Sequence, residues 1–130
     1  MAPEHPNARI AMRMWQAAAE GDAPELRRIF SDDIVWRSPG RNRLSGEYHG
    51  PDAVLDYLAR VGEDATELKL TLDDVYPNDV GAVLTYHVSA RRGAQALEMD
   101  GLLLLAIRDR QVVSALSVPV DQRTNDEFWL

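Results

Sequence analysis

The sequence contains no cysteine, and this absence excludes several kinds of site. Without a thiol, the chain can form no disulfide, no cysteine nucleophile and no zinc or iron–sulfur centre with cysteine ligands. Lysine is almost absent as well, because Lys69 is the only lysine among 14 basic residues. Lys69 lies in an alternating stretch that is typical of a strand, so we do not expect a Schiff-base mechanism.

Positive charge and long apolar segments are also scarce. The 14 basic residues are outnumbered by 21 acidic ones, which gives a formal net charge of −7. Nucleic acids and anionic membranes bind clustered positive charge, so neither is an expected partner. The longest apolar run covers residues 102–107, far fewer than the ~20 residues that cross a bilayer. No targeting segment is visible at the N-terminus, and we expect a cytoplasmic protein.

Motifs for metals and cofactors are missing too. The three histidines, His5, His49 and His87, are far apart and show no metal-binding spacing. The sequence has no glycine-rich nucleotide-binding loop and no nucleophile elbow. We therefore expect neither a metal nor a cofactor.

What the sequence does contain is the composition of one folded domain. Its 130 residues are 45% hydrophobic and 27% charged, which is ordinary for a globular protein. A chain of this length can bury a core and still enclose a pocket. We expect a single domain that covers residues 1–130.

Hydrophobic spacing divides the chain into a helical half and a strand half. Helical spacing predicts a helix over 7–20, capped by Asn7 and ended by Gly21, then a short helix capped by Asp22. A further helix begins at Pro51 and is closed by Gly62. Alternation predicts strands over 34–37, 68–72, 80–90, 97–108 and 111–120, with a loop over 41–50. This order predicts an α+β fold in which N-terminal helices pack on a curved antiparallel sheet.

Several short strings in the first half, together with the ends of the chain, resemble one family. The strings are Phe30–Trp36, Pro39-Gly40, Leu44–Gly46, Tyr48–Gly50 and Ala53-Val54, with Glu20–Asp22 before them and Asp121–Trp129 after them. In these the chain resembles the SnoaL-like branch of the NTF2-like superfamily over nearly its whole length. The resemblance implies a cone of helices wrapped by a curved sheet, an alpha+beta barrel-like shape with a deep hydrophobic pocket. It also implies a homodimer through the outer face of the sheet.

The same resemblance leaves the reaction open, because the superfamily includes polyketide cyclases, ketosteroid isomerases, limonene epoxide hydrolases and non-catalytic binding modules. The position of the isomerase general base corresponds to Ser38, and that of its oxyanion-hole tyrosine corresponds to Met14. The position of the cyclase acid–base residue corresponds to Ser117. The resemblance therefore argues against an ordinary isomerase or cyclase of these types.

A histidine–carboxylate pair is the main catalytic candidate. Aligning the 80–90 strand on the turn at Gly93 directs Thr85 and His87 toward the pocket. A two-residue turn there also sets His87 opposite Asp100 on the next strand. In a catalytic pocket His87 accepts a proton and Asp100 holds its tautomer. The alternative is a structural pair, since a buried carboxylate needs a partner.

The expected pocket draws its walls from helices, strands and one loop. Besides the pair, its candidate ligand-binding residues are Met14, Trp36, Ser38, Tyr48, Leu58, Thr85, Leu102 and Ser117. Two function classes remain open. One is a cofactor-independent isomerase, cyclase or hydrolase that acts on a hydrophobic molecule by acid–base chemistry. The other is a non-catalytic module that binds a ligand or a second copy.

Overall fold

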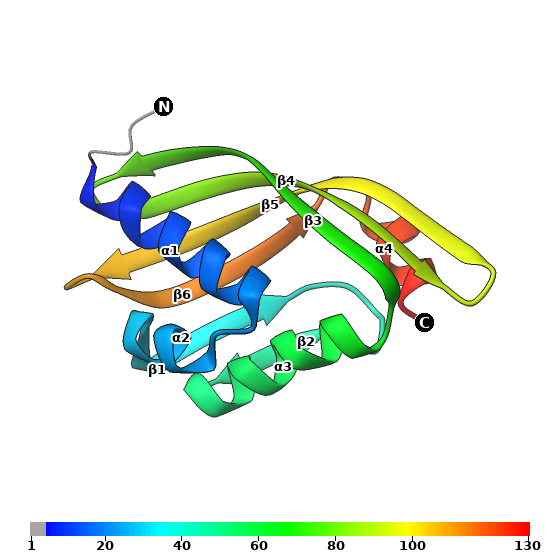
Figure 1. Cartoon of the computed structure of the whole chain (residues 1–130), viewed down its shortest axis with the longest axis horizontal. Helices are drawn as coiled ribbons and strands as arrows, with labels where there is room; N and C mark the ends of the chain where they lie inside the picture. The colour runs from blue at the N-terminus through cyan, green and yellow to red at the C-terminus, as the bar shows by residue number, and fades with distance from the viewer. Residues whose placement is uncertain (1–4) are drawn as a thin grey trace.

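The structure is a computed structural model that describes residues 5–130 (Figure 1). The first four residues of the expected domain lie outside the described part. The elements are α1 (Pro6–Glu20), α2 (Ala23–Ile29), β1 (Phe30–Ser38), β2 (Gly46–His49), α3 (Pro51–Glu63), β3 (Thr66–Asn78), β4 (Gly81–Arg92), β5 (Gln95–Arg108), β6 (Gln111–Pro119) and α4 (Gln122–Phe128). Within residues 5–130, no helix is long and apolar enough to cross a membrane.

The helix ends follow from local capping, with two departures from expectation. The cap of α1 is His5, whose Nδ1 accepts the Asn7 backbone N–H at 3.1 Å, so the expected Asn7 cap is wrong. Gly21 ends α1 in the left-handed region and the Asp22 side chain caps α2, both as the sequence predicts. Gly62 does not close α3, which continues to Glu63.

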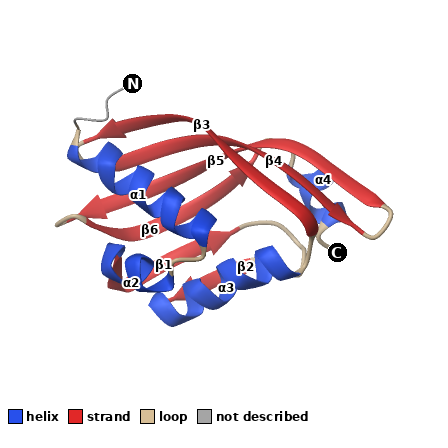
Figure 2. Ribbon diagram, viewed as in Figure 1, coloured by secondary structure: helices blue, strands red, loops and turns tan. Residues whose placement is uncertain are grey.

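One mixed sheet forms the second layer of the fold (Figure 2). Among the described residues, its strand order is β2-β1-β6-β5-β4-β3, and the two ends do not pair, so the sheet is not a closed barrel. Neighbouring strands are antiparallel except for β1 and β6, which run parallel. The expectation of a wholly antiparallel sheet is wrong at this pair. β2 lies within the segment expected to be a loop, and it pairs with β1.

The first three helices cover one face of the sheet. α1 contacts β3 and β4, α2 contacts β1 and β6, and α3 contacts β1, β2 and β3. α4 lies in a segment for which the sequence pattern predicts no helix, and it packs against β5 and β6. The arrangement of helices and sheet confirms the α+β class.

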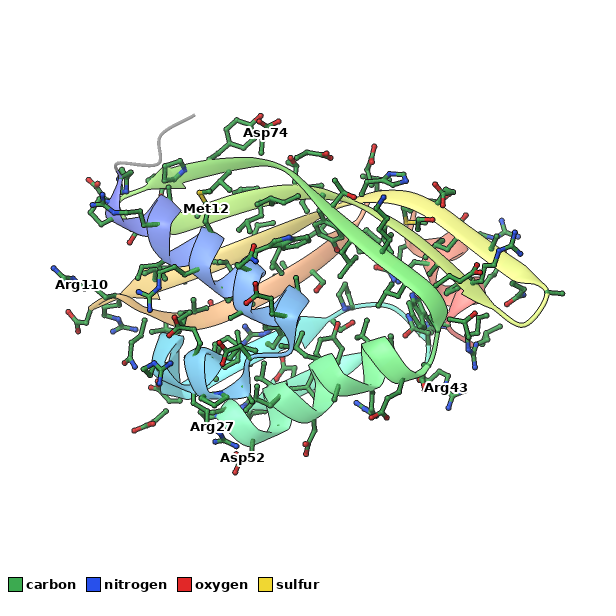
Figure 3. All side chains as sticks on the ribbon, viewed as in Figure 1. Met12, Arg27, Arg43, Asp52, Asp74 and Arg110 are labelled. Carbon is green, nitrogen blue, oxygen red and sulfur yellow. The ribbon has the colours of Figure 1, made fainter. Side chains whose placement is uncertain are left out.

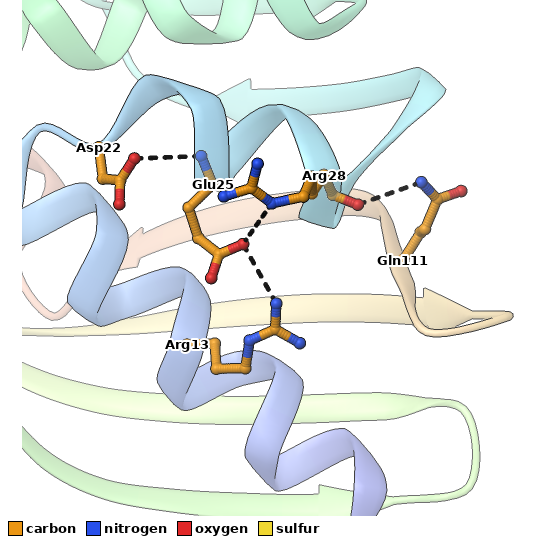
Figure 4. A network of polar contacts seen from close by, with 5 residues as sticks. All are labelled: Arg13, Asp22, Glu25, Arg28 and Gln111. Atoms are coloured by element: carbon orange, nitrogen blue, oxygen red, sulfur yellow. Dashed lines mark hydrogen bonds and ion pairs between the residues drawn. The ribbon is translucent and has the colours of Figure 1, made fainter.

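Polar contacts hold the helices in place over the sheet. Glu25 Oε1 accepts from Arg13 at 3.2 Å and from Arg28 at 3.1 Å, which joins α1 to α2 (Figure 4). These hydrogen bonds, Arg28 first, lower the pKa of Glu25. Arg27 and Asp52 lie side by side with 2.6 Å between Nη2 and Oδ1, linking α2 to α3 (Figure 3). Since these pairs are exposed, they fix orientation more than they add stability.

Candidate functional site

A cavity of about 520 Å³ lies between the helices and the sheet. That volume is within the range of small-molecule sites. Five aromatic side chains contribute to its wall: Trp15, Trp36, Tyr57, Tyr86 and Trp129. These include all three tryptophans of the sequence. Helical and strand periodicity direct the first four of them inward, because each lies on the apolar side of its element or beside it, whereas Trp129 follows the end of α4.

The cavity opens between the ends of two helices and the edge of the sheet. Its exposed wall residues include Ala18 and Ala19 at the end of α1, Gly62 in α3 and Leu70 on β3. The groups at this opening are small or apolar, apart from the exposed Lys69. Gly62 has ordinary helical geometry, and a Cβ added there meets no atom within 4 Å. Position 62 therefore has room for a side chain beside the cavity.

Part of the cavity wall is formed by the segment that contains α4. Trp129 there is only 5% exposed. Arg92 Nη1 donates to the carbonyl oxygens of Phe128 at 3.0 Å and Leu130 at 2.6 Å. Asn42 donates to Asp126 Oδ1 at 2.7 Å, which ties the loop after β1 to α4. These bonds make the α4 segment a fixed wall of the cavity.

A polar cluster lies at the base of the cavity. Trp36 Nε1–H donates to Ser117 Oγ at 3.3 Å. Burial raises the pKa of Tyr57, and the neighbouring polar groups of Ser38 and then Ser117 oppose this rise without cancelling it. Tyr57 is therefore a neutral hydroxyl at every physiological pH.

Tyr86 provides a second phenol on the sheet side and is half-buried. Burial, with a smaller effect of Tyr57, raises the pKa of Tyr86 to about 12. Its ring packs over Gly101, where an added Cβ would be 2.7 Å from both Cζ and Oη of Tyr86. Because Gly101 has no side chain, the Tyr86 ring can pack directly against its backbone.

Charged groups are nearly absent from the wall. Among its lining residues in the described chain there is no aspartate, glutamate, histidine or arginine, and Lys69 is the one residue of a charged type. Lys69 is itself exposed. The cavity therefore presents aromatic faces and neutral hydroxyls to a ligand, with no group of ordinary basicity that could accept a proton deep inside.

Five of the residues expected in the pocket do line the cavity. They are Met14, Trp36, Ser38, Leu58 and Ser117. Tyr48 does not reach it: its ring stacks on Tyr57 with centroids 4.5 Å apart, and its hydroxyl donates to the Leu44 carbonyl. Tyr48 therefore supports a wall residue from behind.

The histidine pair lies on the other side of the sheet. His87 is opposite Asp100 as expected, with 2.9 Å between Nδ1 and Oδ1, and its Nε2 is 3.1 Å from Glu98. The His87 side chain is 39% exposed, whereas its strand neighbours Tyr86 and Val88 line the cavity. The expected placement of His87 and Asp100 in the pocket is therefore wrong.

The same inversion of the strand faces moves two further candidates outward. Thr85 and Leu102 are directly paired on β4 and β5, and both lie outside the cavity wall. The Thr85 hydroxyl instead accepts the backbone N–H of Asp74 at 3.1 Å. Their expected placement in the pocket is wrong because successive residues of a strand point to opposite faces.

The residues that sequence reasoning missed are mainly aromatic. Tyr57 could have been identified from the sequence, because it carries the one hydroxyl on the apolar face of its helix, between Val54 and Val61. Tyr86 belongs to an alternating apolar set with Leu84 and Val88. Trp129 gave no signal of its own, because nothing in the local sequence shows that the chain end turns back onto the sheet.

The comparisons with known proteins agree with this geometry. The sequence model of the SnoaL-like domain matches residues 11–115. An uncharacterized protein of Mycobacterium tuberculosis is 27% identical over 122 residues, covering 92% of this chain and 93% of that protein. The structure of Bal32a, from a soil-derived mobile gene cassette, has a TM-score of 0.90 at 26% identity and covers 96% of this chain and 97% of that one.

A second similar structure shares the fold at lower identity. TerC, co-crystallised with polyporic acid, has a TM-score of 0.82 at 15% identity and covers 95% of this chain and 97% of that one. The sequence match extends from α1 to β6 and so includes most of the cavity wall. The chain belongs to the SnoaL-like domain family.

Proposed function

We propose that this protein binds an uncharged, hydrophobic small molecule in the cavity without transforming it. The observation that carries the proposal is the wall itself, where five aromatic side chains surround neutral hydroxyls. Apolar burial provides the affinity at such a site, and a few polar groups orient the ligand. TerC, which shares the fold, was crystallised with polyporic acid, and this supports a cavity that accepts ring-bearing molecules.

The geometry favours binding over acid–base catalysis. A proton abstraction needs a base near the reacting atom, and the wall holds no carboxylate or histidine among the described residues. The two phenols have raised pKa values, so they are weak acids and are not ionised as bases near neutral pH. His87 and Asp100 lie on the far face and have no access to a ligand in the cavity.

The test is calorimetric titration with 2-ethylnaphthalene, a rigid hydrocarbon without charge. The wild type is expected to bind it. Leu58→Trp fills the cavity and is expected to abolish binding, because Leu58 is a half-buried wall residue. Leu55→Trp, on the same helix but outside the wall, is the matched control and should retain it. The proposal would be refuted if the hydrocarbon bound equally well to all three proteins, or if it bound to none of them.

A second copy of the chain is the proposed protein partner. The outer face of the sheet carries an apolar patch of half-buried or exposed side chains from β4, β5 and β6: Val83, Leu102, Leu104, Leu116 and Val118. Leu104, at its centre, is 38% exposed. An apolar face of this kind favours association, and a homodimer is what the family resemblance implies.

Light scattering tests the homodimer. At micromolar concentration the expected mass is twice the chain mass of 14.6 kDa. Leu104→Asp introduces a charge into the patch and should shift the protein to the monomer, while Thr71→Asp, also on the outer face but outside the patch, should not. A monomeric wild type would contradict the proposal.

A further inference from the structure

The outer face of β5 carries opposite charges at its two ends. β5 lies between β4 and β6 in the sheet (Figure 2), and successive residues of a strand point to opposite faces. On the outer face β5 presents, in order, Glu98, Asp100, Leu102, Leu104, Ala106 and Arg108. Two carboxylates thus lie at one end of this row, apolar groups lie in the middle, and a guanidinium lies at the other end.

Both ends of the row are accessible to a second molecule. The side chain of Asp100 is 68% exposed and that of Glu98 is 65% exposed, although each also contacts His87. Arg108 is exposed as well. Within residues 5–130, no carboxylate forms an ion pair with Arg108. The guanidinium is therefore free to pair with a carboxylate of another chain.

A two-fold axis at Leu104 relates the two ends of the row. Leu104 lies halfway between Asp100 and Arg108 in the sequence, and it is the most exposed member of the apolar patch. In a two-fold dimer, residue i of one copy contacts residue j of the other, and j contacts i. If two outer faces pack with the axis across β5 at Leu104, the two β5 strands run antiparallel. Asp100 of each copy then faces Arg108 of the other.

The geometry of sheet packing allows this contact. Packed sheets lie about 10 Å apart with their strands aligned to within about 30°, a gap that an aspartate and an arginine side chain span together. The same axis sets Leu102 opposite Ala106, so the middle of the row stays apolar. Arg37 of β1 lies level with Leu104 and comes to face its own copy. Glu47 already neutralises Arg37 within each chain, at 3.0 Å.

Other face-to-face arrangements oppose the same charges. If the two β5 strands ran parallel, Asp100 would face Asp100 and Arg108 would face Arg108, and like charges across an interface weaken association. If the axis lay at Leu102, Asp100 would face Leu104 and would lose water without gaining a partner. Of these arrangements, the antiparallel one with its axis at Leu104 is the one that joins opposite charges.

We infer that two copies pack through their outer faces with antiparallel β5 strands that cross at Leu104, and that Asp100 of each copy pairs with Arg108 of the other. The inference rests on the proposed homodimer and adds the relative orientation of its two copies. The apolar patch provides the affinity, and the two ion pairs select the orientation, because charge pairs at the rim of an interface contribute specificity more than affinity.

Charge exchange tests the pairing. Asp100→Arg and Arg108→Asp each place like charges at both contacts, and each should raise the dimer dissociation constant roughly tenfold or more in sedimentation equilibrium. The double variant Asp100→Arg/Arg108→Asp exchanges the two charges and should return the dissociation constant close to the wild-type value. Asp56→Arg makes the same change at an exposed position of α3, away from the outer face, and should leave the dissociation constant unchanged.

Mixing the two single variants provides a further test of the pairing. In a dimer that contains one copy of each variant, both contacts again join opposite charges, so native mass spectrometry should show mainly this mixed dimer. A statistical mixture of dimers, or a double variant that dimerises as weakly as the single ones, would overturn the inference while the homodimer stands. A monomeric wild type would overturn the two together.

A distance measurement gives a readout that does not depend on the charge variants. The sequence has no cysteine, so Ala96→Cys, at an exposed outer-face position of β5, provides a single site for a nitroxide label. Ala96 lies eight residues before Leu104, and at about 3.4 Å per residue antiparallel strands place the two labels roughly 50 Å apart. Parallel strands place the labels opposite each other across a gap of about 10 Å. Such a short distance in pulsed electron paramagnetic resonance would overturn the inference.

Discussion

His87 and Asp100 face each other across β4 and β5 with 2.9 Å between Nδ1 and Oδ1, on the face of the sheet that turns away from the cavity. Glu98 approaches the other ring nitrogen at 3.1 Å. Hydrogen bonds to Asp100 and then Glu98 raise the pKa of His87 above its usual 6.5. This arrangement makes the imidazole a bridge between two carboxylates at the surface.

The first prediction is that His87 stabilises the fold at acidic more than at alkaline pH. Because its pKa is raised on folding, its contribution is complete below about pH 6.5 and disappears as the pH rises through the folded value. Denaturant unfolding of the wild type and of His87→Gln at several pH values should show a difference that shrinks in this window. His49→Gln, another exposed histidine, is the control, and a pH-independent difference would contradict the prediction.

The second prediction concerns Tyr86 in alkali. Burial raises its pKa from 10.0 to about 12, so above pH 10 the phenol ionises more readily in the unfolded chain. Stability should therefore fall as the pH rises from 10 to 12, by up to about 3 kcal/mol for this group. Unfolding measurements on Tyr86→Phe should show a shallower decline. The same slope in both proteins would mean that Tyr86 is not buried as described.

The third prediction uses the open space at Gly62. Gly62→Ala should stabilise the protein by roughly 0.5–1 kcal/mol, since alanine is the better helix former and its Cβ meets nothing. Gly62→Trp should slow the association of 2-ethylnaphthalene by narrowing the mouth, with Gly62→Ala as the control. Stopped-flow fluorescence measures both rates, and equal rates would place the entrance elsewhere.

The fourth prediction concerns the contact between Gly101 and Tyr86. Gly101→Ala should destabilise the protein by roughly 1–3 kcal/mol, because the new methyl group overlaps a rigid ring. Tyr86→Leu removes the ring, so the double variant should be more stable than the sum of the single changes predicts. Thermal unfolding of the four proteins completes the cycle, and strict additivity would refute the contact.

The inward face of β4 could have been predicted from the alternation of its residues, although aligning the strand on its turn assigned the wrong face. In β4 the set Ala82, Leu84, Tyr86, Val88 and Ala90 is wholly apolar, while the alternate set carries Thr85, His87 and Ser89. Alternation alone predicts that the first set faces the helices. Counting from the turn correctly paired His87 with Asp100. Pairing, however, does not say which face is inside.

Other features could not be predicted from local patterns. β2 has only four residues and an exposed, charged outer side, so its pairing with β1 depends on the neighbouring strand. The parallel pairing of β1 and β6 is likewise a property of the whole sheet. Helix caps and helix faces are local, and for this reason Asp22 and the inward faces of α1 and α3 were predictable.

The bond between Trp36 and Ser117 joins residues 81 positions apart in the sequence. The parallel pairing that makes this bond possible sets the last strand of the sheet beside the first, so the cavity has no base until nearly the whole chain is available. Contacts of such long sequence separation slow folding. On the ribosome, α1, α2, α3 and β1 emerge long before β6, and their apolar faces stay uncovered for that interval. The geometry that encloses a ligand thus also makes the nascent chain dependent on protection against aggregation.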